Sequence, residues 1–435
     1  MKFKLALLVG KIIYFFGKFI GKSSNLPGDI ALKICPDLLG RFQIQGKIIA
    51  VTGSNGKTTT ANMVAHVLSC CGHTVTNNAK GSNMTGGVAT TLLNAANFSG
   101  VVPQEYVVLE VDERFSRIIF KSFSPHYMLV TNLFRDQLTR NGNVDVIIDK
   151  LHEAIKPEVK LILNANDPIS SRLAPDNPRV YYMLEENEAS SKECLNITHD
   201  AKVCPVCYHR LSYDYYHYNH IGGYHCDACG FATPKAKYTA HIDDLKAGSF
   251  SIDGFPVKTQ YNSLFNILNI TACVAACCEA GIGEEEAAKA VSTFQVSRER
   301  YDEFKVGDRK AVMILSKNQN PVSFDQSISR VLEMEGEKTV VIYVNNINHT
   351  GHRDTTWLYD IAFERLKDQV DNIVCTGPRA YDLAVRLNMA DFDMSKVKVQ
   401  PFRSRLKSVI QETRGTIYVL TELYDAKGIL EVISR

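Results

Sequence analysis

The stretch Val51-Thr-Gly-Ser-Asn-Gly-Lys-Thr-Thr-Thr60 is a glycine-rich turn followed by a lysine and three threonines. The β-branched run Gly46–Val51 leads into it and predicts a buried strand. The segment Ala61–Ser69 follows it, and its apolar residues recur at helical spacing. A strand, a glycine-rich turn and a helix in this order are typical of a phosphate-binding loop, because backbone N–H groups and the helix dipole attract phosphate oxygens. The stretch therefore predicts a phosphate site on an α/β sheet.

The residue types in this loop have separate predicted roles. Gly53 and Gly56 let the backbone curl around phosphate oxygens, while Lys57 reaches the outer phosphates and the hydroxyl of Thr58 binds Mg²⁺. The usual pattern G-x-x-x-x-G-K-[ST] has glycine where Val51 stands, so this loop is a shortened G-x-x-G-K-T form. A glycine-rich turn that binds nothing is the alternative, and the flanking strand and helix argue against it.

Three further segments place polar residues at the ends of predicted strands. Tyr106–Glu113 ends in three carboxylates, and Tyr127–Asn132 and Lys160–Pro168 each pass from an apolar run to polar side chains. Strands that alternate with helices predict a parallel, doubly wound sheet, in which ligands collect at the carboxyl ends of the strands. We therefore expect Glu110 or Asp112 to help hold Mg²⁺, the alternative being a solvated strand end. The polar, glycine-rich segment Asn77–Gly87 is expected to be a loop at the same edge.

Two cysteine pairs interrupt this pattern. Cys204-Pro-Val-Cys207 and Cys226-Asp-Ala-Cys229 are separated by eighteen residues, a spacing typical of a zinc ribbon with four cysteine ligands. Four such ligands close the coordination sphere, so we expect a structural zinc; four unrelated buried cysteines are the alternative. The segment between the pairs contains one arginine and no lysine, which argues against nucleic-acid binding.

A predicted helix over Tyr261–Ala276 carries Asn262, Asn266 and Asn269 close to one face. Polar side chains on an apolar helix need hydrogen-bond partners, and the edge of an adenine base would provide them. A polar face satisfied within the protein is the alternative. The segment Val296–Tyr301 that follows the next predicted helix is interpreted as a linker with nucleotide-contacting charge.

The first forty residues are expected to form a helical lead-in that ends in a turn at Leu26-Pro-Gly28. Residues 1–20 are apolar with scattered lysines, and no uncharged run among them is long enough to span a bilayer. They predict an amphipathic helix packed on the protein; a helix resting on a membrane surface is the alternative, so membrane contact is at most peripheral. The chain has 435 residues. Its twelve cysteines do not have the pattern of a disulfide framework, which favours a reducing cytoplasm. Its net charge of +2 gives no electrostatic argument for nucleic-acid binding.

The last 135 residues restart an α/β pattern and predict a separate domain. Its expected strands are Ala311–Leu315, Thr339–Val344, Asn372–Cys375 and Gly415–Leu420. A polar loop over 345–357 contains two histidines, an arginine, Asp354 and the only tryptophan of the chain. The predicted domains are 1–40, a central ATP-binding domain 41–295 with the ribbon inserted at 200–232, and 296–435.

The phosphate loop, the asparagine-rich helix and the three-part layout resemble the Mur ligase superfamily. The four-cysteine insertion, the segment Arg353–Asp360 and the segment Gly377–Leu387 are similar to those of its MurT branch, and the resemblance covers nearly the whole chain. It implies a Mur ligase-like α/β fold and an ATP-dependent ligase that amidates the D-glutamate α-carboxylate of lipid II through an acyl phosphate. It also implies a partner, a GatD-type glutaminase subunit that supplies ammonia.

The resemblance carries roles to matching positions. The residues implied for the triphosphate are Gly53, Asn55, Gly56, Lys57, Thr58 and Thr59. Glu110 is implied to share Mg²⁺ with Thr58, and Asn266 and Arg298 to contact the nucleotide. The family's G-R-x-E is here Ser297-Arg-Glu-Arg300, so its acidic member is missing.

No cysteine of this chain stands in a glutaminase-like nucleophile elbow, so a glutamine-derived nitrogen requires a nucleophile from another chain. The resemblance implies that the ligase subunit supplies the carboxylate that orients the partner's histidine. Asp354 and Asp360 are the candidates in the matching segment. Asp354 is preferred because it follows Arg353 in a polar turn from which its side chain can reach outward, whereas Asp360 is expected where a helix starts. A pair within the chain with Arg353 or His352 is the alternative for Asp354. A stand-alone Mur-type ligase that adds an amino acid, and a scaffold that binds nucleotide without turnover, remain alternatives.

Overall fold

The computed structural model describes residues 1–19, 21, 23–79, 81–135, 143–295, 301–345, 354–423 and 425–433. The chain divides into two compact units. Unit 1 comprises 1–134, 143–193 and 201–295, and unit 2 comprises 135–142, 194–200 and 296–435.

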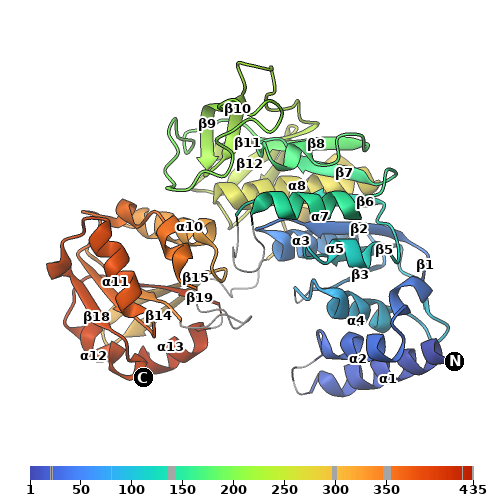
Figure 1. Cartoon of the computed structure of the whole chain (residues 1–435), viewed down its shortest axis with the longest axis horizontal. Helices are drawn as coiled ribbons and strands as arrows, with labels where there is room; N and C mark the ends of the chain where they lie inside the picture. The colour runs from blue at the N-terminus through green and yellow to red at the C-terminus, as the bar shows by residue number, and fades with distance from the viewer. Residues whose placement is uncertain are drawn as a thin grey trace. The chain divides into compact units, whose positions relative to one another are not determined.

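Unit 1 is built on a nine-stranded sheet of the order β13-β12-β11-β8-β7-β6-β2-β5-β3, counted over the described residues (Figure 1). All neighbours from β11 to β3 pair in parallel, and β12 and β13 add an antiparallel edge. The strands are β2 (Lys47–Thr52), β3 (Val75–Asn77), β5 (Tyr106–Glu110), β6 (Tyr127–Val130), β7 (Lys160–Asn164), β8 (Arg179–Leu184), β11 (Tyr238–Asp244), β12 (Ser249–Ile252) and β13 (Phe255–Lys258). The parallel sheet expected from the alternation of strands and helices is confirmed.

Helices cover both faces of this sheet. The helices and short 3-10 turns are α1 (Lys2–Gly17), α2 (Leu26–Ile34), η1 (Leu38–Arg41), α3 (Lys57–Cys70), α4 (Thr85–Ala95), α5 (Ser116–Ile119), α7 (Val144–Ala154), η2 (Ser170–Arg172), α8 (Leu264–Ala280) and α9 (Glu284–Val291). Ile48 and Ala50 of β2 belong to the core that includes residues of α1, α4 and α7, whereas α3 and α8 pack together and each contact the sheet. Successive side chains of a strand point to opposite faces, so one apolar strand serves two helical layers.

Two local predictions in unit 1 are wrong. Leu26-Pro-Gly28 does not form a turn but begins α2, where Pro27 occupies the first helical turn that tolerates it. Gly28 and Gly86 allow α2 and α4 to pack closely, because a Cβ on Gly28 would lie 1.9 Å from the carbonyl oxygen of Gly86. The expected loop Asn77–Gly87 ends earlier than predicted, since α4 begins at Thr85.

The segment with the cysteine pairs forms a separate hairpin of β9 (Ser212–Tyr218) and β10 (Ile221–His225). A buried contact fixes it to the main sheet: His220 Nε2 lies 3.2 Å from Asp167 Oδ1, and Asp167 Oδ2 accepts from the N–H of Leu133. A second small pair, β1 (Gln43–Ile44) with β4 (Val101–Val102), is parallel.

Unit 2 contains a six-stranded sheet of the order β14-β15-β19-β16-β17-β18, parallel except for β14. Its strands are β14 (Tyr301–Val306), β15 (Arg309–Ser316), β16 (Lys338–Tyr343), β17 (Asn372–Thr376), β18 (Val397–Gln400) and β19 (Thr416–Glu422). Its helices and 3-10 turns are α10 (Pro321–Leu332), η3 (Thr356–Asp360), η4 (Phe363–Leu366), α11 (Ala380–Met389), η5 (Met394–Lys396), η6 (Arg403–Arg405), α12 (Leu406–Gln411) and α13 (Ala426–Ile433). The four predicted strands are confirmed; the two edge strands β14 and β18 were not predicted.

Candidate functional site

The phosphate loop leaves β2 and enters α3 through two glycines in the left-handed region. Gly53 has φ 127° and Gly56 has φ 83°, conformations that L side chains rarely adopt. The end of β6 supports the turn, since Asn132 accepts from the N–H groups of Ser54 and Asn55 at 2.8 and 2.9 Å through its carbonyl and side-chain oxygens. The loop is therefore held in a fixed, strongly curved conformation before any ligand enters.

Lys57 begins α3 and is buried in an ion pair with Glu113. The Nζ of Lys57 lies 2.8 Å from Oε1 of Glu113, and the same oxygen accepts from the N–H of Gly53 at 3.1 Å. The ammonium also donates to the carbonyl oxygen of Gly53. Burial opposes the charge, but the carboxylates of Glu113 and Glu110 outweigh it and raise the pKa of Lys57. The lysine is thus a fixed cation inside the loop, and Glu113 is a site residue that had no individual prediction from the sequence.

Thr58 and Glu110 lie together beside Gly81. A Cβ on Gly81 would lie 3.2 Å from Oγ1 of Thr58 and 3.5 Å from Oε2 of Glu110. The Oε1 of Glu110 accepts from the side-chain amide of Asn83, whereas its Oε2 is buried and has no hydrogen-bond partner among the described residues. An unsatisfied buried carboxylate oxygen is costly, and a hydroxyl beside a carboxylate is the donor set that Mg²⁺ prefers. These residues therefore fit the predicted magnesium site.

Two asparagines extend the loop site. The side-chain Nδ2 of Asn55 is buried without a partner within the described ranges, which leaves a donor for a ligand oxygen. Asn269 on α8 packs directly on the loop, because a Cβ on Gly56 would lie 2.5 Å from its Oδ1. Asn266 lies one helical turn earlier and is half-buried. The asparagine spacing on this helix was the sequence signal for Asn269, although the resemblance assigned a nucleotide contact only to Asn266.

The four cysteines form one cluster. Their sulfur atoms lie within 4.8 Å of one another, with Cys204 and Cys229 3.6 Å apart and Cys207 and Cys226 3.5 Å apart. A disulfide requires about 2.05 Å, whereas four sulfurs bound tetrahedrally at about 2.3 Å from a metal lie roughly 3.8 Å apart. The separations fit a shared metal ion and exclude disulfides.

The two cysteine turns repeat one backbone geometry. The N–H of Cys204 donates to the carbonyl of His209 at 2.7 Å, and the N–H of Cys226 donates to that of Phe231 at 2.7 Å. The fourth residue after each first cysteine has a positive φ, 62° at Tyr208 and 75° at Gly230. Two matching turns that face each other present their four thiols to one point, as tetrahedral coordination requires.

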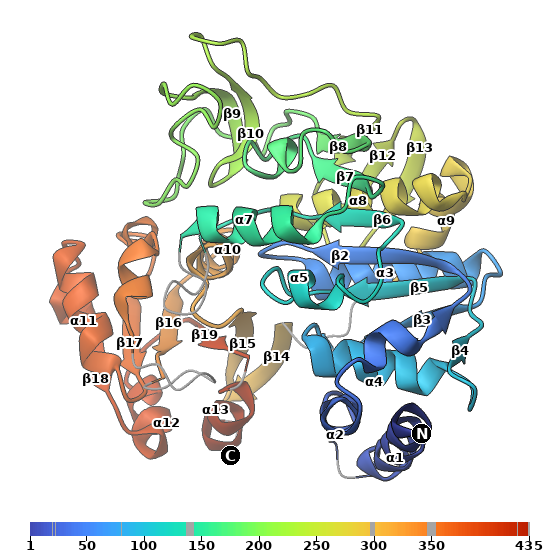
Figure 2. The same ribbon diagram turned by 45° about the vertical axis from the view of Figure 1, so that its right-hand side comes forward.

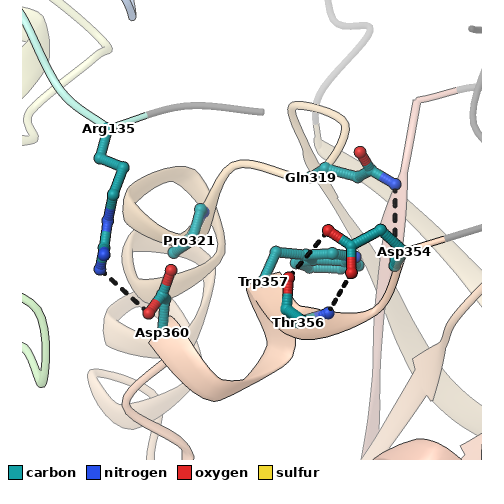
Figure 3. Close-up of a pocket in the computed structure, with 7 residues that line it drawn as sticks. All are labelled: Arg135, Gln319, Pro321, Asp354, Thr356, Trp357 and Asp360. Atoms are coloured by element: carbon teal, nitrogen blue, oxygen red, sulfur yellow. Dashed lines mark hydrogen bonds and ion pairs between the residues drawn. The ribbon is translucent and has the colours of Figure 1, made fainter. Parts of the chain in front are cut away.

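In unit 2 a small pocket contains both candidates, Asp354 and Asp360, for the carboxylate that would orient a partner's histidine (Figure 3). The carboxylate of Asp354 accepts from the N–H of Thr356 at 3.0 Å and from its hydroxyl at 2.8 Å, which fixes its orientation. Asp360 ends η3 and does not start a helix as expected; its Oδ1 pairs with Nη2 of Arg135 at 3.0 Å. Burial raises the pKa of Asp360 and Arg135 partly offsets that rise. Asp360 thus already has Arg135 as a partner for its carboxylate, whereas the carboxylate of Asp354 is oriented by Thr356. Arg298 lies outside the described residues.

Comparisons with known proteins identify two family models in the chain. The Mur ligase middle domain matches residues 51–277, and the MurT ligase C-terminal domain matches residues 315–426. The chain is 33% identical over 395 residues to the lipid II isoglutaminyl synthase (glutamine-hydrolyzing) subunit MurT of Staphylococcus aureus (strain COL), covering 89% of this chain and 88% of that protein. It is 28% identical over 427 residues to the subunit of the same name from Streptococcus pneumoniae (strain ATCC BAA-255 / R6), covering 97% and 94%.

Solved structures show the same fold. A pseudomurein peptide ligase type C from Methanothermus fervidus matches with a TM-score of 0.70 and 21% identity, covering 91% of this chain and 80% of that one. MurF from Acinetobacter baumannii matches with a TM-score of 0.63 and 17% identity, covering 93% and 80%. At these identities the likeness concerns the fold alone, and it confirms the predicted Mur ligase-like α/β class.

Proposed function

Because the chain belongs to the MurT family of Mur ligases, we propose that it is the ATP-dependent synthase subunit that amidates the D-glutamate α-carboxylate of the lipid II stem peptide to D-isoglutamine. Support comes from the curated relatives, whose shared name is that of a glutamine-hydrolysing lipid II isoglutaminyl synthase subunit. The observation that carries the proposal within this chain is the phosphate loop with its buried Lys57. The proposed location is the cytoplasm, and nucleic acid has no part in the function.

The reaction requires activation of a carboxylate, which does not react with ammonia at neutral pH until one oxygen becomes a leaving group. We propose that the γ-phosphoryl group of ATP passes to the carboxylate, that ADP leaves, and that ammonia then displaces phosphate from the acyl phosphate. The loop N–H groups and Lys57 hold the triphosphate, and Asn55 donates to a phosphate oxygen. Bound Mg²⁺ neutralises phosphate charge, and Thr58 and Glu110 are the residues that would hold it. Asn266, Asn269 and Arg298 are proposed to contact the nucleotide.

The cysteine cluster is proposed to hold one structural zinc ion. Four thiolates complete a tetrahedral sphere, so no position remains for substrate or water. The ion would fix the two cysteine turns and the hairpin β9–β10. The zinc ribbon therefore belongs to the architecture of the central domain and not to its chemistry.

Ammonia is proposed to come from a GatD-type glutaminase subunit. The cysteine–histidine pair of a glutaminase is a weak catalyst unless a carboxylate holds the imidazole in one tautomer. Asp354 is proposed to supply that carboxylate across the interface, because Thr356 orients it while Asp360 is already paired with Arg135.

The test compares Asp354→Asn with the matched variant Asp360→Asn in the complex with the glutaminase subunit. Asp354→Asn keeps the shape and removes the charge, so amidation driven by glutamine should fall at least about a hundredfold, less than the loss of about 10⁴ in a serine-protease triad. Amidation from high free ammonium should be retained, since it bypasses the glutaminase. Asp360→Asn should lose much less activity with glutamine.

The same assay separates the alternatives. Equal loss of activity with both nitrogen sources would place Asp354 in the ligase site or in the fold, and no loss with either would exclude it from the reaction. Turnover with an amino acid and no glutaminase would indicate a stand-alone Mur-type ligase. Nucleotide binding without any turnover would indicate a scaffold.

A further inference from the structure

Helix α1 presents an apolar face to solvent. Its six large exposed side chains are Leu5, Leu8, Ile12, Phe15, Phe16 and, just beyond its end, Phe19, with between 47 and 77% of their surface accessible. They recur at spacings of three and four residues and therefore share one side of the helix, which we call the outer face. The ring of Phe15 contacts those of Phe16 and Phe19, with centroids 5.4 and 5.7 Å apart. Such a continuous apolar face is unusual on a protein surface and marks an interaction site.

The orientation of α1 is fixed, because the side opposite the outer face is buried against the protein. Ala6, Gly10 and Gly17 are buried, and a Cβ on Gly10 would lie 2.8 Å from a methyl carbon of Leu93 on α4. The helix lies at the edge of unit 1 with α2 and α4 beside it (Figure 1, Figure 2). The close approach at Gly10 and the burial of Leu7 set the orientation, so α1 could not rotate its outer face inward without a large rearrangement.

Lysines flank the outer face. Lys4, Lys11 and Lys18 recur every seven residues along one border, and Lys2 lies near the other. Lys11 is half-buried and donates to the carbonyl of Ala96 at 2.6 Å, whereas Lys4 and Lys18 are exposed. No aspartate or glutamate occurs among the first 28 residues, so positive charge around the apolar face is not neutralised from its own element.

We propose that α1 docks unit 1 on the surface of an anionic lipid bilayer, with its outer face inserted among the acyl chains and its lysines at the phosphate level. Helices with Phe and Leu on one face and lysines along the border bind in this way. A second copy of the chain fits less well as the partner. If two outer faces packed together, the lysines of the two helices would lie near one another, and α1 has no acidic residue to neutralise them. None of the described helices is long and apolar enough to cross a membrane, so the contact is interfacial.

The test is co-sedimentation of the full chain, without nucleotide or glutamine, with vesicles of phosphatidylcholine or of an equal mixture of phosphatidylcholine and phosphatidylglycerol. We expect binding to the mixed vesicles and much weaker binding to the neutral ones. The variant Phe15→Ser/Phe19→Ser should lower the partition coefficient at least about tenfold. Lys4→Gln/Lys18→Gln should lower it about twenty-five-fold, that is, roughly fivefold for each lysine.

The control variant Tyr381→Ser/Met389→Ser removes two equally exposed apolar side chains from α11 and should bind vesicles like the unmodified chain. Circular dichroism should show the same melting for all variants, since the replaced residues are exposed. An unmodified chain that stays in the supernatant with mixed vesicles overturns the proposal, as does an equal loss of binding in the α11 control. A dimer that Phe15→Ser/Phe19→Ser dissociates, in the absence of vesicle binding, assigns the outer face to a second copy instead. Because no ligase activity is measured, the result is independent of the proposed function.

Discussion

Replacing Lys57 with methionine removes one charge from an almost completely buried ion pair. The side chains of Lys57 and Glu113 are 9 and 8% exposed, and their charged atoms are 2.8 Å apart. Methionine fills a similar volume without the charge. The remaining carboxylate of Glu113 would keep the N–H of Gly53 as a partner but lose its counter-ion.

The magnitude follows from the geometry. Two unit charges 2.8 Å apart attract by about 6 kcal/mol at an effective dielectric constant of about 20. Desolvation of both groups offsets part of this attraction, and removal of one member of a buried pair typically costs about 3–5 kcal/mol. We expect Lys57→Met and Glu113→Gln each to destabilise unit 1 by such an amount. The double variant should cost clearly less than the sum, because neither charge then remains unpaired.

Urea unfolding measured by two probes provides the assay. The only tryptophan of the chain is Trp357 in unit 2, so its fluorescence reports that unit, while far-UV circular dichroism reports both. The single substitutions should shift the dichroism transition and leave the tryptophan transition in place. In parallel, Lys57→Met should abolish ATP-dependent amidation, because the cation that faces the outer phosphates is gone.

Additive costs in the double variant would refute the argument that the two charges stabilise each other. Near wild-type turnover of Lys57→Met at saturating ATP would contradict the assignment of the phosphate loop itself. A shift of the tryptophan transition as large as that of the dichroism transition would show that the effect is not confined to unit 1.

Three further predictions concern other parts of the chain. Metal analysis should find one zinc per chain, whose apparent binding free energy is roughly 10–16 kcal/mol. Cys204→Ser should lose both the zinc and solubility; absence of zinc, or iron–sulfur absorbance, would contradict this. Burial raises the pKa of Asp325 from 3.8 to about 6, so the folded state holds its proton more tightly, and this carboxyl should cost unit 2 roughly 3 kcal/mol of stability as the pH rises from about 4 to above 6. Burial also raises the pKa of Glu422 in the same unit to about 7, which adds a slope of the same sign. The tryptophan transition of Asp325→Asn should therefore show a smaller slope than the unmodified chain, and an unchanged slope would assign the effect elsewhere. Gly56→Ala should abolish ATP binding measured by calorimetry, because residue 56 has a φ of 83° and the new Cβ would lie 2.5 Å from Oδ1 of Asn269; normal affinity would show that the loop adapts.

Features carried by short continuous segments could be predicted from the sequence. The phosphate loop is determined by Gly53, Gly56 and Lys57, since left-handed turns, helix start and cation all lie within a few residues. The cysteine pairs are determined in the same way, because each C-x-x-C segment makes its own turn. The buried parallel strands could be recognised as continuous apolar runs, because a strand covered by helices on both faces has no side chain in contact with water.

Errors arose where local sequence permits two structures. Leu26-Pro-Gly28 suits both a turn and a helix start, and packing against α4 decides for the helix because only glycine allows the close approach to Gly86. The edge strands β14 and β18 mix charged and apolar residues, and it is the neighbouring strands β15 and β17 that complete their hydrogen bonds.

The site itself depended on tertiary structure wherever its members come from different segments. Any of the three carboxylates at the end of β5 and just beyond it suited the loop by composition, and the sheet register places Glu113 on Lys57 and Glu110 beside Thr58. Asn269 meets Gly56 only because α8 packs on α3, more than two hundred residues away in the chain. The sequence determined which groups were available, since chemistry follows residue type and local turns; the fold decided which of them share a low-dielectric space, since pairing, desolvation and metal geometry depend on distances between segments that are remote in the chain.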